Sequence, residues 1–409
     1  MSGYTPGLRP SEPYPPSRTV GAAHVHAGAT PPPWGQGAPP GTAGPRWPEP
    51  ASRRGTPVWG VLAVVLVGIV TLVSIGQIAD ITGSGAAVAG GVVALVPLVV
   101  VLLGIRWVDR WEPEPRLTLL FALLWGAGVA TLVSLVLNTA VSMAVYATTG
   151  DVTTAETVGA VVSAPLVEES AKGLGVLLIL LARRRYFDGP VDGIVYAATV
   201  GAGFAFVENI LYFGESIETL PAVFIMRGIM SPFAHVIFTA AIGVALGLAS
   251  RSRSRAAWVL AFPAGWFVAV VLHALWNGSA VAGTFFALYG LVQVPLFVGV
   301  VVLVLWLRRQ ERGVIGARLG EYAAAGWFAP HEVAMLTSFP ARRRARAWAS
   351  GRGAGAAMTR FQRAATELAF ARQRAATGRA DLRQGADERA LLERVTASRH
   401  EFAGAAARG

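Results

Sequence analysis

Seven polar or ionisable residues interrupt segments that are otherwise apolar. They are Glu168, Glu169 and Lys172 in one segment, Glu208 in the next, His235 in a third, and His273 with Asn277 in a fourth. Carboxylates and imidazoles can move protons or hold a divalent metal, and an asparagine amide can donate to an oxyanion. Because the chain has no cysteine, any metal ligands must come from His, Asp, Glu or Asn.

The segments that carry these residues are long enough to cross a bilayer. Hydrophobic residues make up 54% of the chain and charged residues only 14%, whereas a soluble domain carries about 25% charge. Apolar runs near the ~20 residues that span a membrane occur at 57–79, 86–105, 117–147, 159–181, 192–213, 222–249, 256–279 and 282–307. The sequence therefore predicts an all-α, polytopic membrane bundle of about eight transmembrane helices.

Arginine is concentrated on one side of these predicted spans. The loops at 183–185 and 308–309 carry arginines, whereas the alternating loops, such as 148–158, carry no basic residue. By the positive-inside rule, we expect a multi-pass protein of the cell membrane with both termini in the cytoplasm. Arg227 is the exception, because it would lie near the outer surface.

Composition divides the chain into three zones. Residues 1–56 are rich in proline and predict a disordered cytoplasmic tail. Residues 57–307 hold the spans, and residues 308–409 predict an arginine-rich, helical cytoplasmic tail. The basic faces of that tail favour contact with anionic lipid. No nucleic-acid-binding motif accompanies them, so we do not expect nucleic acid as a partner.

Depth in the membrane groups the polar residues into one site. A charge near the bilayer centre costs roughly 2.5–3.5 kcal/mol and therefore points to function. For Glu168 and Lys172 alone, four residues apart, a structural ion pair explains the pattern equally well. However, a rise of ~1.5 Å per residue places Glu168, Glu208, His235 and His273 all about 8–15 Å below the outer surface. This shared depth predicts one site in the outer half of the membrane.

These residues stand in short motifs that resemble the PrsW family of intramembrane proteases, which is related to the CAAX-prenyl protease group. The matching pieces are Glu168-Glu169-Ser-Ala-Lys172 for its EExxK motif, Phe204 to Glu208 for its FxxxE motif, a separate His235, His273-Ala-Leu-Trp-Asn277 for the HxxxN of the wider group, and the loop Asp109–Pro115. The resemblance covers about Ile105 to Trp306. It implies hydrolysis of peptide bonds in membrane-anchored proteins, of which an anti-sigma factor is one example.

Two mechanisms stay open for such a protease. Either zinc is held by Glu208, His235 and His273, or a glutamate activates water without a metal. In both, we expect the catalytic set to be Glu168, Glu169, Glu208, His235, His273 and Asn277, with Lys172 in support. The helical face through Glu168 is small or polar and the face through Glu169 is mostly apolar, which favours Glu168 as the base.

Two functions of other classes also fit the composition. A secondary transporter would keep ionisable groups near mid-membrane, but it would show repeated halves with broken helices, which the sequence lacks. A non-catalytic membrane scaffold would suit the tails and the apolar spans, but it leaves the intramembrane acids without a role.

Overall fold

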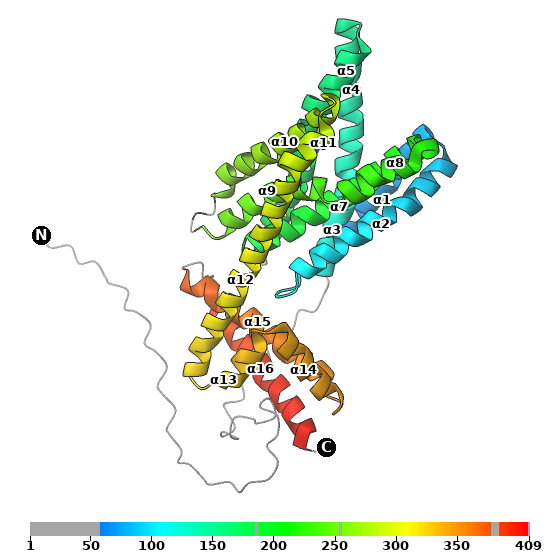
Figure 1. Ribbon diagram of the computed structural model, residues 1–409. Coiled ribbons are helices and arrows are strands. Elements are labelled where there is room, and N and C mark those ends of the chain that lie inside the picture. Colours follow the sequence, from blue (N-terminus) through cyan, green and yellow to red (C-terminus); the bar gives the residue numbers. More distant parts are fainter. Residues whose placement is uncertain (1–57, 185–186, 253, 255, 378–383, 408–409) are drawn as a thin grey trace, which may run out of the picture. The chain divides into compact units, whose positions relative to one another are not determined.

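The computed structural model describes residues 58–184, 187–252, 254, 256–377 and 384–407, and the regular elements among them are all helical (Figure 1). These residues form two compact units. One lies within Trp47–Val314 and Thr366–Ala390, and the other within Ile315–Ala365 and Leu391–Gly409. The predicted disordered tail, residues 1–56, lies outside the described residues.

Among the described residues, seven helical segments are long and apolar enough to cross a membrane. They are Val58–Thr82 (α1), Ser84–Val108 (α2), Arg116–Thr149 (α3, η2 and α4), Pro190–Glu215 (α7), Ile217–Ser250 (η4, α8, η5 and α9), Trp258–Val281 (α10) and Phe285–Ala324 (α11, η6 and α12). The predicted all-α, polytopic membrane bundle is thus confirmed.

The span predicted at 159–181 is not among these seven. It corresponds to η3 (Gly159–Ser163) and α6 (Ala164–Arg183), which continue without a break from α5 (Val152–Val158). Helix α6 has 20 residues, but Glu168, Glu169 and Lys172 all lie within it and are buried. Because three charged residues lie within α6, its composition does not mark it as a span, although their side chains are buried. The total of eight spans and the side of each terminus stay predictions.

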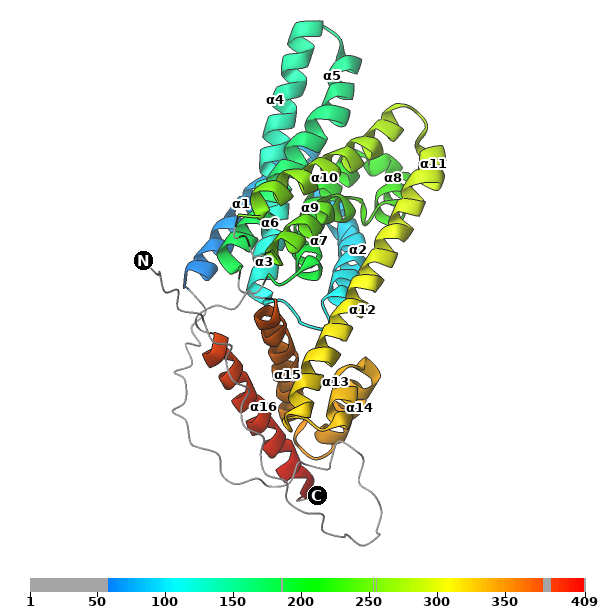
Figure 2. The ribbon, with the colours of Figure 1, turned by 90° about the vertical axis from the view of Figure 1, so that its left-hand side faces the viewer.

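Helix α7 is the central element of the first unit. It is buried over most of its length and packs against α2 and α9 (Figures 1 and 2). Glycines allow the neighbouring backbones to come close: a Cβ on Gly203 would lie 2.0 Å from the carbonyl oxygen of Leu123, and one on Gly193 would lie 2.0 Å from that of Gly243. The backbones of α7 and α9 (Ala234–Ser250) therefore lie close together, and side chains of the two helices come into contact.

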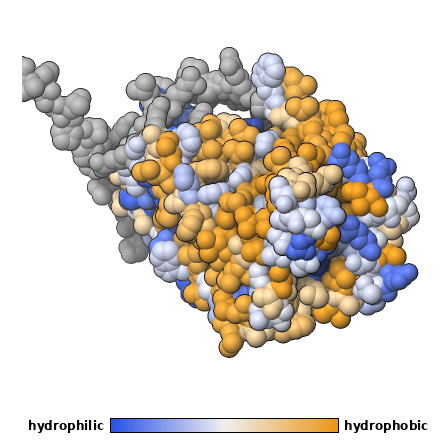
Figure 3. Space-filling model, turned by 90° about the horizontal axis from the view of Figure 1, so that it is seen from above, coloured by the Kyte–Doolittle hydropathy of each residue, from blue (hydrophilic) through white to orange (hydrophobic). Residues whose placement is uncertain are grey.

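The outer helices of this unit present apolar side chains outward. Leu72 of α1 is 70% exposed, Leu103 of α2 is 61% exposed and Val302 of α12 is 59% exposed. Apolar residues likewise cover much of the face seen from above in Figure 3. Exposed apolar area of this extent suits contact with lipid, because a soluble protein rarely leaves such large patches in water.

The α4–α5 hairpin precedes the site helix α6. Helix α4 (Thr131–Thr149) ends at Gly150, whose φ of 67° is a left-handed conformation that glycine adopts at low cost. Asp151 then caps α5, and its carboxylate accepts hydrogen bonds from the backbone of Thr153 and Thr154. In both ribbon views α4 and α5 lie side by side. This turn directs the continuous helix α5–η3–α6 back toward α7.

The loop Asp109–Pro115 connects the start of α3 (Arg116–Leu124) to α7 through a side-chain hydrogen bond. The Asp109 carboxylate accepts the backbone N–H of Glu114 at 3.2 and 3.1 Å, and the Tyr196 hydroxyl of α7 donates to Glu114. Burial raises the pKa of Asp109 to about 7 and raises that of Glu114 well above its usual range. The loop therefore places a buried carboxyl group, that of Glu114, beside the partly buried Asp109 at one end of these helices.

The second unit is a small helical bundle. It contains the end of α12 (Val294–Ala324), α13 (Pro330–Leu336), α14 (Phe339–Ser350), the first part of α15 (Gly355–Ala376) and α16 (Gln384–Ala407) from Leu391 onward. Leu336, Phe361 and Val395 are fully buried in its core. Arg399 of α16 makes two 2.9 Å contacts with the Glu332 carboxylate. The helical form predicted for this tail is thus confirmed.

Candidate functional site

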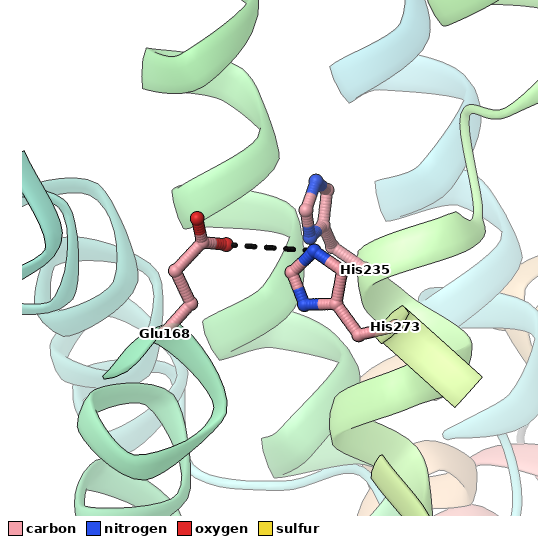
Figure 4. A group of neighbouring side chains, drawn as sticks. All are labelled: Glu168, His235 and His273. Carbon is pink, nitrogen blue, oxygen red and sulfur yellow. Dashed lines mark ion pairs between the residues drawn. The ribbon is translucent and has the colours of Figure 1, made fainter. Parts of the chain in front are cut away.

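Three helices bring Glu168, His235 and His273 together inside the first unit. Glu168 projects from α6, His235 from α9 and His273 from α10, and Figure 4 shows the carboxylate facing both imidazoles. One ligand atom of each residue lies within 4.8 Å of those of the other two, and all three residues are buried. A carboxylate and two imidazoles thus converge in a buried group.

Local backbone features set these positions. A π-helical turn, η5 (Ile225–Met230), ends at Ser231, and α9 restarts at Ala234, so His235 lies in its first turn. The α9 backbone there lies close to α7, since a Cβ on Gly201 would be 2.8 Å from the carbonyl oxygen of His235. Breaks and π-turns of this kind often occur at functional sites.

Glu169 holds His273 in one orientation. Its Oε1 atom lies 3.1 Å from Nδ1 of His273, and its Oε2 atom accepts the Thr239 hydroxyl at 3.1 Å. Because an ionised carboxylate can only accept, Nδ1 must carry the proton in a neutral imidazole. The lone pair of His273 is then on Nε2, which faces Oε2 of Glu168 at 3.9 Å.

Glu208 holds His235 in the same way. Its Oε2 atom lies 2.8 Å from Nε2 of His235 and also pairs with the Arg227 guanidinium of η5. The same guanidinium donates to the Asn209 side chain at 2.8 Å. The lone pair of His235 is therefore on Nδ1, by the argument that applies to His273.

Lys172 lies between the carboxylates and His235. Its ammonium is 2.6 Å from Glu169, 3.4 Å from Glu168 and 3.2 Å from Nδ1 of His235, and it lies over the Phe204 ring at 4.0 Å. The side chain is fully buried. A buried lysine without partners would be very costly, so these contacts explain how a cation is tolerated here.

Charge and ligand type together fit a divalent metal. Three carboxylates, those of Glu168, Glu169 and Glu208, face two cationic side chains, so the cluster has one surplus negative charge when both imidazoles are neutral. One carboxylate with two histidines is a known zinc ligand set. Glu169 and Glu208 each hold one imidazole in a fixed orientation, as carboxylates do for histidine ligands in metal sites.

The structure groups the predicted ligands differently from the sequence. Among the described residues, the converging group contains Glu168 with His235 and His273, whereas Glu208 contacts His235 through Nε2. Asn277, the predicted oxyanion donor, gives its amide N–H to the backbone carbonyl of Ala160 at 2.8 Å. The roles of all seven predicted residues stay predictions.

Two residues at the site were not predicted. Arg227 neutralises Glu208, and Thr239 donates to Glu169. Arg227 did carry a signal, since it is the one arginine on the side of the predicted spans whose loops carry no basic residue. Thr239 carried none, because an isolated threonine in an apolar helix is common and its direction depends on packing.

The fold and the cluster together define a multi-pass membrane protein with a buried carboxylate–imidazole site. Residues 114–311 match the model of the family described as PrsW family intramembrane metalloprotease. The matched stretch contains every residue of the site.

Known relatives agree with this family. Protease PrsW of Clostridioides difficile is 32% identical over 151 residues, which cover 37% of this chain and 61% of that protein. Protease PrsW of Bacillus subtilis is 32% identical over 120 residues, which cover 29% and 50%. That of Geobacillus kaustophilus is 38% identical over 91 residues, which cover 22% and 38%.

The chain thus spans between 38% and 61% of the length of these curated relatives. No solved structure matches it.

Proposed function

We propose that this chain is a membrane protease that hydrolyses peptide bonds of membrane-anchored proteins, with Glu168 as the base. The observation that carries the proposal is the convergence of Glu168, His235 and His273 from three helices within the segment that matches the PrsW family model. The names of the three relatives also support protease activity.

The contacts of the two adjacent acids support different roles for them. Glu169 is fully buried and contacts Lys172, His273 and Thr239. Glu168 makes longer contacts, at 3.4 Å to Lys172 and 3.9 Å to His273. A base must give a lone pair to a water proton, so the carboxylate with the longer contacts is better suited to act as the base.

Hydrolysis then follows from these residues. Glu168 takes a proton from water as the water oxygen adds to the scissile carbonyl carbon, and it later gives that proton to the leaving amide nitrogen. His273 and His235 are kept in fixed orientations by Glu169 and Glu208. In the alternative metal-dependent mechanism, a divalent metal, for which zinc is the best match, would be held by Glu168, His235 and His273 and would supply Lewis acidity, and Glu168 would then serve as a ligand and not as the base.

Co-expression with a single-span reporter substrate tests the activity. We expect the wild type to cleave the reporter, and Glu168→Gln and His273→Ala to accumulate in the membrane without cleaving it. Glu156→Gln is a matched control, since Glu156 is exposed on α5, outside the cluster, and should keep full cleavage. Normal cleavage by Glu168→Gln would refute its role as base, and no cleavage by the wild type would refute the proposed activity for that substrate.

The second unit supports contact with anionic lipid headgroups. Arg343, Arg344 and Arg352, on and just after α14, are exposed, and each such cation near an anionic membrane surface contributes about 1 kcal/mol. Hydrogen exchange of full-length protein in nanodiscs tests this contact. Residues 341–352 should be better protected with anionic lipid than with zwitterionic lipid, and Arg343→Gln with Arg344→Gln should remove the difference. Equal protection in both lipids would refute the contact.

A further inference from the structure

Lys172 touches two of the three groups that a metal would need. Its ammonium lies 3.4 Å from Oε2 of Glu168 and 3.2 Å from Nδ1 of His235. Since Nε2 of His235 is 2.8 Å from Glu208 and donates to it, Nδ1 carries the only lone pair of that ring. Lys172 therefore donates into the lone pair with which His235 would bind a metal.

The charges of the cluster lead to the same result. With Lys172 and Arg227 both present, the three carboxylates leave one surplus negative charge. A divalent ion added to that set would make the buried cluster net positive, whereas the same ion without the Lys172 charge would balance it. A buried site tolerates unbalanced charge poorly.

We infer that the Lys172 ammonium and a divalent metal compete for the Glu168–His235–His273 group, so that Lys172 must withdraw from His235 before the metal is bound. This inference rests on the metal site of the proposed protease. Lysine is suited to such exchange, because its ammonium is a compact charge on a flexible stem and is not a fixed planar fork as in arginine.

Zinc binding to the purified full-length protein tests the competition. Bound zinc is measured by elemental analysis after equilibrium dialysis of wild type, Lys172→Met and Lys172→Arg. Methionine keeps the length of the side chain without the charge, so Lys172→Met should bind zinc at least tenfold more tightly than wild type. Lys172→Arg keeps the charge and should bind no more tightly. Adding His273→Ala to Lys172→Met should abolish the gain.

A second measurement needs no substitution. Lys172 is the only lysine in the chain, so selective labelling of the lysine side-chain nitrogen gives one ammonium NMR signal in the wild type. Zinc should shift or broaden that signal at the same concentrations at which it binds. This result is available even if Lys172→Met fails to fold.

Three outcomes would overturn the inference. They are equal or weaker zinc binding by folded Lys172→Met, an unchanged lysine signal while the wild type binds zinc, and the absence of zinc binding in every variant. None of these readouts involves peptide cleavage. Failure of the inference is therefore separate from failure of the proposed activity, which the reporter assay measures.

Discussion

Replacing Glu168 by glutamine should mainly remove activity, whereas replacing Glu169 by glutamine should mainly lower stability. Glu169→Gln removes a charge from a fully buried ion pair in which Lys172 lies 2.6 Å away. Removal of one partner from such a pair typically costs 3–5 kcal/mol. Because Glu168 stays 3.4 Å from the same ammonium, we expect the low end, about 3 kcal/mol. At roughly 2–4 °C per kcal/mol, the Tm should fall by about 6–12 °C.

Glu168→Gln should show the opposite pattern. Its contacts with Lys172 and His273 are longer, at 3.4 and 3.9 Å, so we expect a loss of only about 1 kcal/mol in the free energy of unfolding. The amide cannot accept a proton from water, and loss of a general base costs ~100-fold or more in rate.

Thermal unfolding in detergent and reporter cleavage below the Tm measure the two effects. Glu168→Gln should be inactive and nearly as stable as wild type, whereas Glu169→Gln should be less stable and should keep clearly more activity. A larger loss of activity in Glu169→Gln, with little change in its Tm, would show that the roles of the two acids are reversed.

Three further predictions concern the fold. Burial raises the pKa of Asp109 from 3.8 to about 7, so the folded state binds that proton more tightly than the unfolded chain does. The free energy of unfolding should therefore fall as pH rises from about 4 to about 7. In unfolding curves measured across this pH range, Asp109→Asn should reduce the fall by roughly 2 kcal/mol. Gly203→Ala would place a Cβ 2.0 Å from the carbonyl oxygen of Leu123 in α3 and should lower the free energy of unfolding by about 3 kcal/mol or more. Gly76→Ala is the control: no atom lies within 4 Å of its Cβ, so this change should be neutral or stabilising. Equal unfolding temperatures for the two variants would contradict the close packing at Gly203. Reporter fusions after Asp151 and after Arg183 should report opposite sides of the membrane, and the same side for both would mean that α5–η3–α6 does not cross it.

The sequence alone determined that this is a helical membrane protein. Uninterrupted apolar runs must form helices in lipid, because the backbone there has no water with which to hydrogen-bond. It also identified candidates for the site, since each charge placed in such a run costs free energy and is kept for a reason. The spacing of Glu168, Glu169 and Lys172 along one helix was readable because a helix places residues three and four apart on neighbouring positions.

Only the tertiary structure decided which of these groups meet. Sequence reasoning gave similar depths for Glu208 and Glu168, but depth is one coordinate, and the rotation of each helix about its axis is set by packing. The close approach of α7 to α9 at Gly201 turns Glu208 to Nε2 of His235, where Arg227 also pairs with it. Glu168 is thereby left to face the two histidines, and the contact of Lys172 with His235 follows from the same packing. Rotation and proximity depend on contacts between residues far apart in the chain, which local patterns do not encode.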